Sequence, residues 1–216
     1  MSPSWNLGQR YEAAIREILK KRDLLPVLLE GNDAGFIHKG VVHFVEIKNV
    51  NAPDFGQKGL TWSQASGWQW REKDVITDMY DQFGVIGQIN KGFVPRRHSV
   101  AIDKLTPADK SYDQQQFEKS GIDLDINHLY EFYARKKCNY IQVEGRGFYF
   151  MKADLAGLNV PRFHARLTLR LRAKTHHSHP IHNYSFFAVI QAKKNTILSS
   201  KFDLEEKTGT FPPITK

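Results

Sequence analysis

The chain has 216 residues, of which 41% are hydrophobic and 25% are charged, and these globular proportions exclude a disordered chain or a coiled coil as a description of the whole. Its formal net charge of +8 and sequence pI near 9.5 favour polyanionic partners, of which nucleic acid is the commonest. The single cysteine, Cys138, excludes an internal disulfide and a cysteine-rich zinc module. No apolar run approaches the roughly 18 residues that span a bilayer, so we expect a cytoplasmic protein with no membrane partner.

The N-terminal part of the chain predicts one helix and then strands. Apolar residues recur at helical spacing over residues 7–21, and Asn6 is a suitable N-cap. Residues 31–35 carry the glycine, asparagine and aspartate of a turn or a strand edge. Residues 41–48 are β-branched and aromatic, which predicts a strand.

The rest of the chain predicts helices followed by a β-rich region. Residues 55–80 look helical in part, residues 107–121 read as a loop or a surface helix, and residues 125–137 have a helical pattern. The segments that predict strands are 99–102, 140–143, 148–151, 165–174 and 184–191.

This order of elements predicts an α/β (α+β) fold, in which a mixed central sheet flanked by helices carries a β-rich C-terminal extension. No linker rich in glycine, serine or proline divides the chain, so we expect a single domain over residues 1–216. Its core would occupy about residues 7–105, and its β-rich part about residues 125–205.

An acid and a base share one face of the strand at residues 41–48. Residues two apart in a strand point the same way, so Glu46 and Lys48 project together while Val45 and Ile47 face the core. If Asp33 lies on the adjacent strand of a hairpin, its carboxylate can reach Glu46. Two converging carboxylates repel each other unless a cation lies between them, and Mg²⁺ prefers a few carboxylates completed by water and phosphate oxygens. The alternative is an ordinary surface strand and an unrelated aspartate.

Asn32-Asp33, followed by Glu46-Ile47-Lys48, resembles the motif of the PD-(D/E)xK nucleases, with Asn32 at the position where the family often has proline. The resemblance implies a restriction-endonuclease-like core that hydrolyses phosphodiester bonds with Mg²⁺. It also implies that Asp33 and Glu46 bind the metal, that the Ile47 carbonyl is a further ligand, and that Lys48 acts on the attacking water.

Two weaker resemblances to the family lie before and after this motif in the sequence. Residues 8–12 are similar to the family's first helix, whose glutamate often approaches the metal; Glu12 is therefore a catalytic candidate, with a salt bridge to Arg16 as the alternative. Residues 54–57 resemble the start of the helix after the catalytic strand, where the family frequently has a glutamine. We therefore take Gln57 and the neighbouring Lys58 as DNA-binding candidates, although a glutamine there is usually only surface.

Basic residues elsewhere are candidates for DNA contact. Arg166, Arg170, Arg172 and Lys174 recur at even spacing, so in a strand they would share one face and could bind phosphates or guanine edges. The alternative is a solvated sheet face. The other candidates are Arg96 and Arg97, in a basic patch that could also be an exposed loop, and Arg146, at the tip of a hairpin around Gly145 and Gly147.

Two further clusters have mainly structural interpretations. Trp62, Trp68 and Trp70 could stack bases, but core or dimer packing is the commoner use of such residues. The histidines between 176 and 182 could bind zinc, but a hairpin loop is favoured because Pro180 is present and no cysteine pair accompanies them.

These observations predict a Mg²⁺-dependent, sequence-specific endonuclease for double-stranded DNA, similar to a Type II restriction enzyme. Such an enzyme would act as a homodimer on a palindromic site. It would need no nucleotide cofactor and would be prokaryotic or phage-encoded. Two alternatives stay open: a structure-specific nuclease, such as a Holliday junction resolvase or phage repair nuclease, and a non-catalytic DNA-binding protein.

Overall fold

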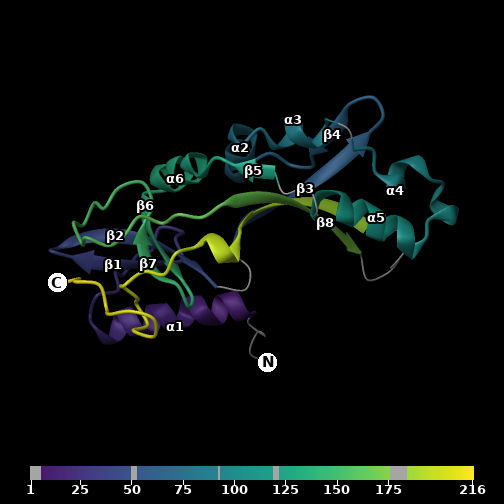
Figure 1. Cartoon of the computed structure of the whole chain (residues 1–216). Coiled ribbons are helices and arrows are strands. Elements are labelled where there is room, and N and C mark those ends of the chain that lie inside the picture. Colours follow the sequence, from purple (N-terminus) through teal and green to yellow (C-terminus); the bar gives the residue numbers. More distant parts are fainter. Residues whose placement is uncertain (1–5, 50–52, 92, 119–121, 176–183) are drawn as a thin grey trace. The chain divides into compact units, whose positions relative to one another are not determined.

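The computed structural model describes residues 6–49, 53–91, 93–118, 122–175 and 184–216 (Figure 1). The histidine cluster between 176 and 182 lies outside these residues. The chain groups into two compact units, each described here by itself. Unit 1 comprises residues 1–53, 129–166 and 193–216, and unit 2 comprises residues 54–128 and 167–192. The expected single domain stays a prediction.

Unit 1 contains a four-stranded sheet in the order β1-β2-β6-β7. Strand β2 pairs antiparallel with β1 and parallel with β6, so the sheet is mixed, as expected. The last two strands are not part of a C-terminal extension, because they complete the same sheet as β2. The strands are β1 (Ala34–His38), β2 (Val41–Lys48), β6 (Cys138–Val143) and β7 (Gly147–Phe150).

Helix α1 (Leu7–Lys21) forms as the sequence predicts. Asn6 caps it by accepting a hydrogen bond from the Gln9 N–H, and Ile15 and Leu19 are fully buried. These two side chains belong to the same core cluster as Val45 and Ile47 of β2. One face of β2 is therefore buried in the core that α1 shares, which directs the alternate residues Glu46 and Lys48 to the other face.

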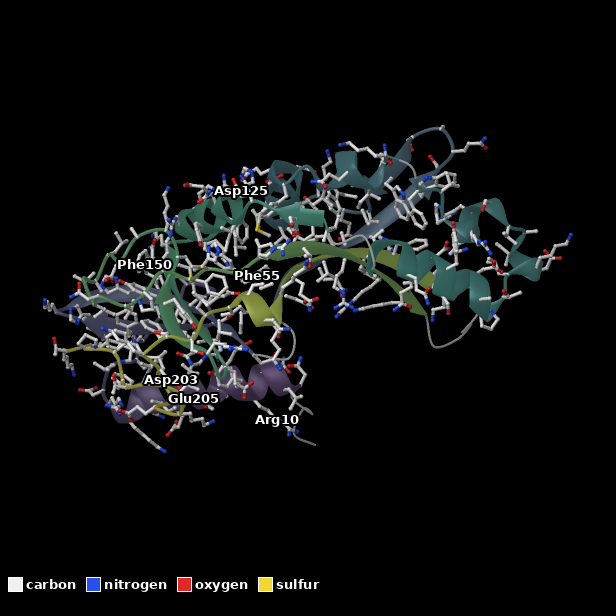
Figure 2. All side chains as sticks on the ribbon, viewed as in Figure 1. Arg10, Phe55, Asp125, Phe150, Asp203 and Glu205 are labelled. Atoms are coloured by element: carbon white, nitrogen blue, oxygen red, sulfur yellow. The ribbon has the colours of Figure 1, made fainter. Side chains whose placement is uncertain are left out.

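The C-terminal segment is tied to unit 1 through buried polar groups. The Gln142 side chain, fully buried on β6, donates to Asp203 Oδ1 at 2.7 Å and to the Tyr11 hydroxyl at 3.1 Å. The Tyr11 hydroxyl in turn donates to Glu205 at 2.9 Å. Figure 2 shows Asp203 and Glu205 beside α1. Because buried polar groups without partners are costly, this network fixes α1, β6 and the C-terminal segment to one another.

Unit 2 contains a five-stranded antiparallel sheet in the order β4-β3-β9-β8-β5. The prediction of partly helical structure over residues 55–80 is wrong for most of that segment, since only α2 (Val75–Gln82) is a helix there. The strands are β3 (Asp54–Ser63), β4 (Gly67–Trp70), β5 (Ile122–Leu124), β8 (Leu167–Thr175) and β9 (Tyr184–Ala192).

Short helices complete the two units. The strand expected over residues 99–102 is absent, because α4 and a 3₁₀ turn occupy that stretch. Of the two interpretations left open for residues 107–121, a loop or a surface helix, the structure has a helix, α5, over Pro107–Glu118. The helix predicted at residues 125–137 is present as α6, which belongs to unit 1 from Leu129 onward. The bounds are α3 (Val85–Ile89), α4 (Arg96–Ser99), η1 (Ile102–Lys104), α5 (Pro107–Glu118), α6 (Ile126–Arg135) and η2 (Lys194–Thr196). No helix in the described part of the chain is long and apolar enough to cross a membrane.

Candidate active site

The three residues of the predicted motif meet in unit 1. Asp33 directly precedes β1, and the pairing of Ala34 with Val45 places it beside β2. Its Oδ2 accepts a hydrogen bond from the Ile47 N–H at 2.9 Å. Lys48 Nζ lies 2.6 Å from Glu46 Oε1, which confirms that these two side chains share one face of the strand.

Burial and crowding set the charge state of the site. The pKa of Asp33 is raised to about 6, first because burial removes water from the carboxyl and then because the Glu46 charge is close. Burial alone would lower the pKa of Lys48, but Glu46, Asp33 and Glu12 together raise it above its usual value. Lys48 is therefore an ammonium ion at neutral pH, and the carboxyl group of Asp33 nearby is costly to ionise.

Tyr133 is a member of the site that the sequence did not reveal. Its hydroxyl, on α6, donates to Glu46 Oε1 at 2.8 Å, the same oxygen that Lys48 contacts. Burial, and then the Glu46 charge, raise the pKa of Tyr133 well above its usual value, so it stays a donor. Two donors on one oxygen fix the Glu46 carboxylate in a single orientation.

Glu12 reaches the edge of this site from α1. It forms an ion pair with Arg16 at 3.3 Å, and Arg16 Nε also donates to the Asp33 carbonyl at 2.5 Å. The salt bridge considered from the sequence is therefore present. Glu12 is also close enough for its charge to raise the pKa of Asp33 and of Lys48, so the salt bridge and a place beside the site are compatible.

The oxygen atoms of Asp33, Glu46 and Ile47 are of the kind that bind a hard divalent cation. Glu46 is only 6% exposed, and its charge makes ionisation of Asp33 costly; a cation between the two carboxylates would remove that repulsion. Within the described ranges, no three His, Cys, Asp or Glu side chains converge as a metal-binding group. The expected set of Asp33, Glu46 and the Ile47 carbonyl would thus need water and phosphate oxygens to complete it, which is how Mg²⁺ usually binds.

The predicted DNA-binding residues of unit 2 largely have partners within the protein. Gln57 lies in β3 and not at the start of a helix, so the family likeness fails there. Arg172 forms an ion pair with Asp54 at 3.5 Å. The other contacts are Lys58 with Asp74, Arg96 with Asp109 at 2.9 Å, and Arg170 with Gln191 at 3.1 Å.

The expected basic face on β8 is confirmed only in part. Leu169 and Leu171 are buried while Arg170 and Arg172 are half-buried and Lys174 is exposed, as the alternation predicts. Arg166, however, precedes β8 and belongs to unit 1.

Three other expectations concern Arg146, the tryptophan cluster and Arg97. Arg146 lies in the turn between β6 and β7, as expected for a hairpin tip, and is half-buried. Trp68 and Trp70 are buried, in agreement with core packing, whereas Trp62 is half-exposed. Arg97 forms no ion pair with a described carboxylate and donates to the Tyr184 carbonyl at 2.8 Å.

Comparisons of this chain with protein-family models, with curated proteins and with solved structures found no match.

Proposed function

We propose that the chain is a Mg²⁺-dependent DNA endonuclease of the PD-(D/E)xK type. The observation that carries the proposal is the convergence of Asp33 on β2 beside the Glu46–Lys48 pair, with both carboxyl groups withdrawn from water. A purely structural role does not account for this arrangement, because a carboxyl group whose pKa is raised by its surroundings destabilises the folded protein when it ionises.

In this proposal Asp33, Glu46 and the Ile47 carbonyl hold the metal, which when bound would withdraw charge from a phosphate and activate a water. Lys48 is an ammonium ion in the metal-free protein, because the carboxylates around it raise its pKa. In the proposed reaction it orients the attacking water and stabilises the charge that develops on the phosphate. Tyr133 and Lys48 hold Glu46 Oε1, which leaves Oε2 as the oxygen that would face the metal.

The proposed substrate is double-stranded DNA, cut at a specific sequence by a homodimer. Charge supports a polyanionic substrate, since unit 1 contains 19 Lys and Arg residues against 12 Asp and Glu residues. A structure-specific nuclease would use the same centre, and the choice between the two rests on the DNA that is cut.

The test is cleavage of supercoiled plasmid DNA and of a branched junction by the purified protein. We expect Asp33→Ala, Glu46→Ala and Lys48→Ala each to reduce cleavage at least about a hundredfold, since each removes a charged group from the reacting centre. Lys152→Ala is the matched control, because Lys152 pairs with Glu131 at 2.6 Å on the surface of the same unit. That variant should cleave like the wild type.

Metal dependence gives a second check. Mg²⁺ or Mn²⁺ should support cleavage, whereas Ca²⁺ should support binding with little hydrolysis because its coordination is looser. Discrete bands indicate a sequence-specific enzyme, and cleavage of the junction alone indicates a resolvase. Near-normal cleavage by Lys48→Ala, full activity in excess chelator, or DNA retardation without any cutting would contradict the proposal.

A further inference from the structure

A small hollow in unit 2 combines aromatic and cationic groups. The ladder between β3 and β9 ends at the pair Leu60 and Phe186, while β3 continues to Ser63 and β9 begins at Tyr184. A cavity of about 220 Å³ lies where the strands part. In addition to Leu60, Phe186 and Tyr184, its lining comprises Thr61, Trp62, Arg71, Arg97, His98 and Ser185.

The walls of the hollow offer apolar and aromatic surface. Leu60 and Phe186 are 2% and 3% exposed and contribute an apolar part of the lining. Trp62 is half-exposed, and its ring lies 5.4 Å from the ring of His98 at an interplanar angle of 31°. Burial, and then the Arg97 charge, lower the pKa of His98, so its imidazole is neutral at pH 7. A flat, neutral ring system could therefore stack here.

Two arginines, Arg71 and Arg97, also line the hollow. Arg97 is held by the Tyr184 carbonyl at 2.8 Å, and Arg71 lies 5.6 Å from the Phe187 ring. Neither forms an ion pair with a carboxylate in the described part of the chain. Arg96, the neighbour of Arg97 on α4, differs in this respect because Asp109 neutralises it at 2.9 Å. Arg71 and Arg97 are therefore available to an external anion.

We propose that this hollow binds one unstacked nucleotide of a DNA strand, with the base against Trp62 and His98 and a phosphate between Arg71 and Arg97. Every nucleobase has a π-face that stacks on aromatic side chains, and guanidinium groups bind phosphate oxygens in pairs. An acidic peptide would use the arginines but would offer no flat ring at that spacing. The inference rests on the proposed function only in taking DNA as the partner.

The test measures binding without cleavage, in excess chelator. Probes are a fluorescently labelled 12-nucleotide oligo(dT), a paired duplex, and the same duplex with one extrahelical thymidine. We expect Trp62→Leu and Arg97→Gln each to weaken binding of oligo(dT) and of the bulged duplex about tenfold. Trp62→Phe keeps an aromatic face and should stay within about threefold of the wild type, which separates lost stacking from misfolding.

Arg96→Gln is the matched control, because it removes the same charge from the adjacent position. It should weaken oligo(dT) binding by less than about twofold, and none of the variants should change binding of the paired duplex by more than that. All of these readouts are binding measurements in excess chelator and need no cleavage, so failure of the cleavage proposal would not affect this result.

Two outcomes would overturn the inference. One is equal weakening by Arg96→Gln and Arg97→Gln with no effect of Trp62→Leu, which would mean that only net charge matters. The other is displacement of oligo(dT) by inorganic phosphate as effectively as by thymidine 5′-monophosphate, which would reduce the hollow to a simple anion site.

Discussion

Asp33 in unit 1 and Asp113 in unit 2 are both withdrawn from water, but their surroundings differ. Asp113 is fully buried and accepts three hydrogen bonds, from the N–H groups of Arg96 and Arg97 and from the Tyr184 hydroxyl at 2.6 Å. Among the residues that the structure describes, only Ile47 donates a hydrogen bond to the Asp33 carboxylate, which also lies close to the Glu46 charge. The first carboxylate is surrounded by donors, whereas the second is crowded by another acid.

This difference separates a carboxylate that stabilises the fold from one that destabilises it when charged. Donors around a buried carboxylate compensate for its lost hydration, so Asp113 joins α4, α5 and β9. Asp109, on the same helix, also has donors: hydrogen bonds from Thr106 and then Arg96 lower its pKa to about 2. The two units also differ in net charge. Unit 2 has 12 Lys and Arg residues against 11 Asp and Glu residues, so most of the excess positive charge lies in unit 1.

The largest effect is expected from Asp113→Ala. This change leaves a buried tyrosine hydroxyl and two N–H groups without their acceptor, which should lower the free energy of unfolding by about 3 kcal/mol. Asp103→Ala is the control, because Asp103 is exposed in the same unit and should change stability by less than about 0.5 kcal/mol. Urea unfolding monitored by circular dichroism measures both. A loss below about 1 kcal/mol for Asp113→Ala would break the comparison.

Asp33→Asn should raise the free energy of unfolding of the metal-free protein, whereas Asp113→Ala should lower it. The folded-state pKa of Asp33, about 6, lies above the ordinary value of 3.8, so the folded state binds more protons than the unfolded state between these values. Wild-type stability should therefore fall as the pH rises from about 4 to about 6. Asn mimics the neutral acid and should avoid that fall, so it should gain on the order of 2 kcal/mol at pH 7.5 and little near pH 3.5. Unfolding curves in chelator at these two pH values decide the matter, and equal or lower stability of Asp33→Asn at pH 7.5 would contradict it.

A smaller effect should follow from Tyr133→Phe, which removes one of the two donors that orient Glu46. We expect cleavage to slow about tenfold and Mn²⁺, measured by calorimetry, to bind more weakly, with about 1 kcal/mol lost in stability. Tyr130→Phe is the control, because Tyr130 is buried on the same helix and its hydroxyl donates to the Phe163 carbonyl. It should lose similar stability without a change in Mn²⁺ affinity. A matching loss of affinity in both variants would assign Tyr133 a structural role only.

Local pattern predicted the elements that carry the motif. The strand expected at residues 41–48 has the bounds of β2, because its β-branched run alternates between a core face and the face of Glu46 and Lys48. The helix at residues 7–21 has the bounds of α1, since its cap and apolar spacing are both local signals.

The errors arose where distant segments decide the structure. β3 was missed because its main partner, β9, lies about 130 residues further along the chain, and no local signal reports such a pairing. Gly56 and Gly59 lie within β3, and Gly67, with φ of +65°, begins β4 after the turn. Tyr133 was missed for the same reason, because 87 positions separate it from Glu46.

The order of residues along the chain also has a consequence for synthesis. All of unit 2 has been translated once residue 192 is joined, whereas unit 1 still lacks the segment that holds Asp203 and Glu205. Until that segment leaves the ribosome, Gln142 on β6 and Tyr11 on α1 lack their buried carboxylate partners. The unit with the crowded carboxylates can therefore be completed only after the whole of the β-rich unit has been translated.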